Sequence, residues 1–92
     1  MQLQLKSLHS LRSQEFRKRL RDARLAAGVT QQDLALRLEV PQSFVSKFET
    51  GERRLDVVEF TEVCSAIGIN AAVFLAELLS VATKQNTWGK FD

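Results

Sequence analysis

Apolar residues recur along most of the chain at intervals of three and four positions, which is the spacing of one face of an α-helix. Sustained alternation of apolar and polar residues, the sign of a β-strand, is absent; only residues 3–5 alternate. Gly28, Gly51 and Gly68 follow three of the helical stretches, as expected for residues that end a helix in the left-handed conformation. The pattern predicts an all-α protein.

Five helices follow from this periodicity, over about residues 14–27, 31–38, 41–50, 57–67 and 71–79. Thr30 and Asp33 form an acidic capping box at the second helix, Pro41 fits the first turn of the third, and Asn70 caps the fifth. The expected inward positions are Phe16, Leu20, Ala23, Ala27, Leu34, Ala35, Leu38, Val45, Phe48, Phe60, Val63, Cys64, Ile67, Phe74, Leu75 and Leu78.

These helices predict one compact five-helix domain over residues 14–79, with an amino-terminal extension (1–13) and a carboxy-terminal tail (80–92). Both ends are more apolar than disordered terminal segments usually are, so we expect them to contact a dimer partner or a second protein, or to fold back on the core. The residues behind this expectation are Leu3, Leu5, Leu8, Leu11, Trp88 and Phe91.

The composition narrows the class of protein. The 92 residues are 45% apolar, enough for a small core, but no run approaches the roughly 18 apolar residues that cross a bilayer. Cys64 is the single cysteine, which excludes an internal disulfide and fits a reducing compartment. Since the amino terminus is too polar for a secretory signal, we expect a cytoplasmic protein without a membrane partner.

The net charge of +2 hides an uneven distribution. Residues 1–54 carry eleven Lys or Arg against six Asp or Glu, whereas residues 55–92 carry two against five. A basic half of this kind favours a polyanionic partner on one side of the molecule, although solvated charges can be biased by chance.

The predicted helix 41–50 has an unusual polar face, made of Gln42, Ser43, Ser46 and Lys47, opposite its apolar arc. Ordinary solvated faces favour Glu and Lys four positions apart, and this face does not show that pattern. Gln can bond adenine bidentately, Lys can donate to guanine, and Ser can donate or accept. The face is therefore interpreted as reading base edges, with Phe44 either at the margin of the core or in contact with a thymine methyl group.

Only a short connection separates the second and third predicted helices, which indicates a helix-turn-helix with its second helix in the major groove. The amino end of the first of these helices, with Thr30 and Gln31, then approaches phosphate. Arg53 and Arg54, just after Gly51, are placed for further phosphate contacts.

The segments "RLRDARLAAGVTQQDLALRLEVPQSFVSKFETGERRL" and "AIGIN" together resemble the phage-repressor-like helix-turn-helix family of the Xre or Cro/repressor type. The resemblance implies base contacts from Gln42, Ser43 and Lys47, with Ser46 and Phe44 flanking them. It implies that Gln31 bonds phosphate and braces the recognition helix. It also implies a buried ion pair between Arg24 and Glu49.

Two residues depart from the family pattern. Glu39 stands where members usually have Gly, and a residue other than Gly at positive φ costs on the order of 1 kcal/mol. Pro41 replaces the usual Ser or Thr cap and removes a side-chain bond to the first turn.

Catalysis and metal binding find no support in the sequence. His9 has no second ligand at a suitable spacing, and Cys64 lies on an inward stripe, so we expect no enzyme, metal or cofactor. The leading hypothesis is a homodimeric repressor, bacterial or from a phage and associated with the nucleoid, that binds a palindromic operator in double-stranded DNA. The alternative is a protein-binding antitoxin or small accessory adaptor.

Overall fold

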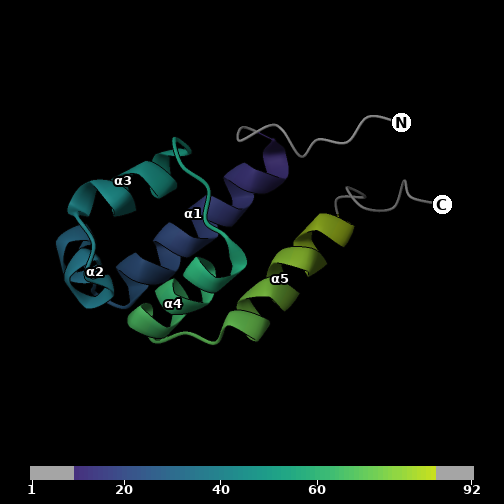
Figure 1. Ribbon diagram of the computed structural model, residues 1–92. Helices are drawn as coiled ribbons and strands as arrows, with labels where there is room; N and C mark the ends of the chain where they lie inside the picture. Colours follow the sequence, from purple (N-terminus) through teal and green to yellow (C-terminus); the bar gives the residue numbers. More distant parts are fainter. Residues whose placement is uncertain (1–9, 85–92) are drawn as a thin grey trace.

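The computed structural model describes residues 10–84, which form five α-helices and no strand, as the sequence predicts. Figure 1 shows the helices in chain order. Their bounds are α1 (Leu11–Ala26), α2 (Gln31–Leu38), α3 (Gln42–Thr50), α4 (Val57–Ile67) and α5 (Ala71–Lys84). The expectations for residues 1–9 and 85–92 lie outside the described residues.

The outer helices are longer than predicted. α1 begins at Leu11 rather than residue 14, because the Ser10 hydroxyl caps it by accepting from the Ser13 amide at 3.1 Å. α5 continues to Lys84 rather than ending at 79. α3 begins at Gln42, so Pro41 is its N-cap and not its first helical residue.

The core lies where α1, α2, α3, α4 and α5 converge. Three aromatic rings tie α1 to α4 and α5: the Phe16 centroid lies 5.5 Å from Phe60 and 5.8 Å from Phe74, and Phe60 lies 5.4 Å from Phe74. Such tilted and edge-on pairs add to the stabilisation from the large apolar area that each ring buries. The side chains with almost no exposure are Leu20, Leu34, Val45, Val63 and Cys64.

Two of the predicted inward positions are wrong. Leu75 is 40% exposed, because α5 packs through Phe74 and Leu78 and Leu75 points about 100° away from Phe74 around the helix. Ala27 is exposed at the end of α1, where the chain turns into Gly28 at φ 73°. Leu38 is half-buried against the core.

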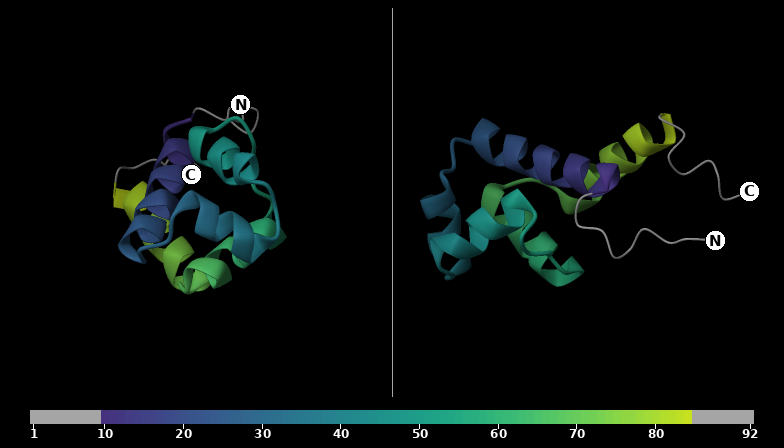
Figure 2. Two further views of the ribbon diagram at one scale, coloured as in Figure 1. Left: turned by 90° about the vertical axis from the view of Figure 1, so that its left-hand side faces the viewer. Right: turned by 90° about the horizontal axis from the view of Figure 1, so that it is seen from above.

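α1 and α5 lie side by side, while α2 and α3 form the opposite end of the molecule. In the right-hand view of Figure 2, the start of α1 and the end of α5 both lie toward one extreme and α2 lies at the other. The start of α2 is thus at a distance from both ends of the described chain, whereas the carboxyl end of α3, at Gly51, lies against Arg17 of α1.

Within residues 10–84, no single helix is long and apolar enough to cross a membrane, although α4 and residues 71–80 of α5, bent by 109°, reach the required length and composition together.

Candidate nucleic-acid interface

Three residues, Glu39 to Pro41, connect α2 to α3. Glu39 holds the left-handed conformation, with φ 59° and ψ 45°, at the position where the family that the sequence resembles usually has glycine. Its amide donates to the Leu36 carbonyl at 3.2 Å, and the Val40 amide donates to the Ala35 carbonyl at 3.0 Å. These bonds close α2 and set the short turn that a helix-turn-helix requires.

Pro41 starts α3 without a side-chain cap, as the sequence indicates. Its carbonyl accepts from the Phe44 amide at 3.0 Å, so the backbone alone forms the first turn. That turn carries Gln42 and Ser43, and no side-chain cap fixes it.

The outward face of α3 carries Gln42, Ser43 and Lys47, which are all exposed. Val45 and Phe48 lie buried on the opposite side, and Ser46 is half-buried between the two faces. The structure therefore brings three of the four expected base-reading side chains onto one open surface and leaves Ser46 at its margin.

A chain of hydrogen bonds links this surface to the core. The Gln42 amide donates from Nε2 to Gln31 Oε1 at 3.3 Å, and Gln31 donates from Nε2 to Glu49 Oε1 at 2.9 Å. Glu49 also accepts from Arg24, at 2.7 Å from Nε and 3.1 Å from Nη2. Arg24 Nη1 donates to the Val29 carbonyl at 2.8 Å. Gln42 is thus oriented through a relay that ends on a fixed charge.

The expected Arg24–Glu49 ion pair is present and buried, with side-chain exposures of 7% and 5%. It joins α1 to the carboxyl-terminal half of α3. Charges this deep need partners, because an unpaired one loses its hydration without compensation. The bidentate geometry and the bonds from Gln31 and to Val29 satisfy both groups.

Thr30 and Asp33 form the predicted capping box at α2. The Thr30 hydroxyl accepts from the Asp33 amide and the Asp33 carboxylate accepts from the Thr30 amide, both at 3.0 Å. The backbone bond from Thr30 is the main cause that lowers the pKa of Asp33. Gln31, the first residue of α2, is half-buried and faces α3 through its bonds to Gln42 and Glu49.

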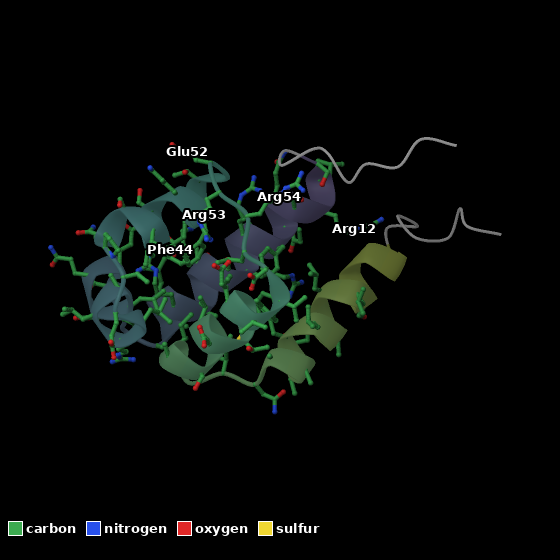
Figure 3. All side chains as sticks on the ribbon, in the orientation of Figure 1. Arg12, Phe44, Glu52, Arg53 and Arg54 are labelled. Atoms are coloured by element: carbon green, nitrogen blue, oxygen red, sulfur yellow. The ribbon has the colours of Figure 1, made fainter. Side chains whose placement is uncertain are left out.

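Arg53 has partners that the sequence did not indicate. Its Nη1 and Nη2 donate to Glu59 Oε1 and Oε2 at 3.1 and 2.8 Å, and its guanidinium lies 4.3 Å from the centroid of the Phe44 ring. Figure 3 shows Phe44 and Arg53 close together below α3, with Arg54 nearer to α1. Arg54 is exposed.

Glu59 is the residue that the sequence reading missed at this position. The hydrogen bonds from Arg53, followed by the one from the Asp56 amide, lower its pKa from 4.5 to about 2. The signal was available, since Asp56 and Glu59 have the spacing of a capping box, which places Glu59 in the first turn of α4.

Phe44 occupies the margin of the core. It is half-buried, packs against the core cluster and meets Phe48 edge-on at 5.8 Å between centroids. Arg53 lies over its ring. Of the two roles that the sequence left open for Phe44, the structure shows the one at the margin of the core.

Residues 10–84 contain no group of three or more metal-binding side chains. Cys64 is buried, and burial raises the pKa of its thiol, which makes it a poor nucleophile. The site consists of hydrogen-bonding side chains on a helix face.

A short turn between two helices, with the second helix presenting an outward polar face, defines a helix-turn-helix protein. The helix-turn-helix family model of the XRE type matches residues 20–74. Among solved structures, an XRE-family like protein from Pseudomonas syringae pv. tomato str. DC3000 is 48% identical, with a TM-score of 0.78, over 84% of this chain and 94% of that one. No curated protein matches.

The chain belongs to the XRE-type helix-turn-helix family. It is in general terms a DNA-binding regulator of a family that is typically non-enzymatic.

Proposed function

We propose that the protein is a sequence-specific repressor of transcription that acts in the cytoplasm and reads double-stranded DNA with α3 in the major groove. The observation that carries this proposal is the open surface formed by Gln42, Ser43 and Lys47 after a three-residue turn. These side chains combine amide, hydroxyl and ammonium groups, which discriminate base edges.

The bond between Gln42 and Gln31 suits adenine recognition. A glutamine amide has two N–H donors and one oxygen, and Gln31 engages only one N–H of Gln42. The second N–H and the oxygen remain to bond adenine N7 and N6, the bidentate pair that glutamine makes. Lys47, one turn beyond Ser43 on the same face, would donate to guanine O6 or N7, and Ser43 and Ser46 would contact neighbouring bases.

Contacts to the DNA backbone are assigned to the flanks of this surface. Thr30 and Gln31 stand at the start of α2, and Arg54 follows α3. Arg53, which the sequence also placed near phosphate, has its guanidinium engaged by Glu59, which favours a structural role for it. Such contacts fix the register of the protein on the duplex and make binding sensitive to salt. Two copies bound to an inverted repeat would place their α3 helices in successive major grooves, about 34 Å apart.

Selection of bound sites from random duplexes, followed by titration of Lys47→Ala, tests the proposal. We expect this substitution to cost about 1–3 kcal/mol of binding free energy and to relax preference at one base position. Lys18→Ala, which removes the same charge from the exposed face of α1, is the matched control and should retain the wild-type preference. Unchanged affinity and base preference in Lys47→Ala would count against the assignment.

A second candidate is a protein-binding role, as an antitoxin or accessory adaptor. It is favoured by apolar side chains that are exposed in the described chain, among them Leu11 at 82% and Val73 at 54% exposure. Affinity purification from the native host distinguishes the two, since a stoichiometric foreign protein supports this role and its absence supports the repressor.

A further inference from the structure

Arg53 joins three parts of the chain at one point. Its guanidinium binds the Glu59 carboxylate in the first turn of α4, lies over Phe44 in the first half of α3, and donates to the Arg54 carbonyl at 2.8 Å. We propose that Arg53 is a positioning residue for the recognition helix, which it holds against the start of α4. The inference rests on the proposed function, because it assigns how α3 is held for reading DNA.

Beyond the 3.3 Å bond from Gln42 to Gln31, α3 has few side-chain ties at its amino-terminal end. Its carboxyl-terminal half is tied to α1 through Glu49 and Arg24, but Pro41 gives its first turn no side-chain cap. Phe44 is the large side chain nearest that turn, and it is only half-buried. A guanidinium over the ring adds a cation–π contact where packing alone is incomplete.

Glu59, the partner of Arg53 on α4, is also held by hydrogen bonds that do not involve Arg53. Glu59 accepts from the Asp56 amide at 3.0 Å, and its own amide donates to Asp56 Oδ1 at 2.7 Å. This capping box fixes the carboxylate at the start of α4. The planar fork of arginine matches it with two bonds, which a lysine ammonium does not reproduce.

A direct phosphate contact is the competing role, since the Arg53 side chain is 39% exposed. The two roles predict opposite effects for Glu59→Gln. If Arg53 mainly neutralises phosphate, removing the carboxylate frees the guanidinium and removes a negative charge, so binding stays equal or tightens. If Arg53 positions α3, the same substitution loosens the helix and weakens binding.

The experiment is a fluorescence-anisotropy titration of a selected duplex at several salt concentrations. Glu59→Gln retains capping-box chemistry, and Glu62→Gln makes the same charge change at an exposed position of α4. We expect Glu59→Gln and Arg53→Lys to weaken binding roughly three- to tenfold, as a partly exposed ion pair and cation–π contact allow. Glu62→Gln should not weaken binding, and the salt slope should stay unchanged in all three.

Glu59→Gln binding as tightly as Glu62→Gln would overturn the proposal. So would wild-type affinity in Arg53→Lys together with a salt slope that falls by about 0.9 in Arg53→Ala, the signature of one lost phosphate contact.

Hydrogen exchange in the free protein separates this proposal from the proposed function. The amides of residues 45–48 should exchange faster in Glu59→Gln and Arg53→Lys than in Glu62→Gln. This expectation holds whether or not the protein binds DNA. Unchanged exchange overturns the positioning role. If the wild-type protein prefers no duplex but the variants still differ in exchange as expected, the result supports the role of Arg53 in holding α3 and refutes only the proposed repressor function.

Discussion

Glu39 adopts a left-handed conformation that glycine reaches without a steric penalty, and the residue is exposed. Glu39→Gly should therefore raise the free energy of unfolding by roughly 0.5–1 kcal/mol, because the relieved strain exceeds the greater entropy of the unfolded chain. Urea unfolding measures this difference. Glu39→Ala, which keeps a Cβ atom, is the control and should show no gain; an equal gain in both variants would mean that strain is not the cause.

Glu59 makes stability depend on pH in the acid range. Its pKa in the folded protein is about 2, below the usual 4.5, so its ion pair contributes fully above about pH 4.5 and is lost as the pH falls towards 2. Thermal unfolding across this range should show a shallower loss of stability for Glu59→Gln than for Glu62→Gln. Asp33, whose pKa is also lowered, should maintain part of the slope in both variants. Identical profiles would refute the role of Glu59.

At the scale of elements, one buried ion pair holds α3 on α1. Glu49→Ala leaves Arg24 buried without its carboxylate and should cost roughly 3–5 kcal/mol in unfolding free energy. The double variant Arg24→Met, Glu49→Leu removes both charges and fills the space, so it should be much closer to wild type. Chemical denaturation measures both, and a loss below about 1 kcal/mol for the single variant would show that water reaches the pair.

The helices differ in how well the sequence predicted them, for physical reasons. α2 and α4 end at the predicted residues because left-handed positions, at Glu39 and Gly68, close them. α5 has no residue that ends a helix near position 79, so its end was predicted too early. The helical spacing of its apolar residues does not show which of them face α1 and α4, and Leu75 was therefore predicted to be buried although it is exposed.

Part of the candidate site could also be predicted from the sequence, and part could not. The outward face of α3 follows from helical geometry, and the Arg24–Glu49 pair from the family resemblance. The contact of Arg53 with Glu59 and Phe44 crosses a loop, and no periodic pattern encodes the path of a loop. The roles of these residues towards DNA remain predictions.

At the scale of the molecule, α2 lies at one end and both ends of the described chain lie at the other. If two copies bind an inverted repeat, inserting about 5 base pairs between half-sites turns them to opposite faces of the duplex, and about 10 base pairs restores the alignment. We expect gel shifts to lose the two-copy complex with the first insertion and to regain part of it with the second. Equal binding to all three spacings would indicate independent monomers.

The relay from Gln42 through Gln31 and Glu49 to Arg24 has a consequence for retargeting this protein to another operator. Positions 31 and 42 should be varied together, because Gln31 is held by the buried Glu49. A new side chain at position 42 would have to fit the orientation that Glu49 gives to the Gln31 amide. A library that varies both positions together samples compatible pairs, whereas one that varies only the outer position leaves most of its members with a mismatched support.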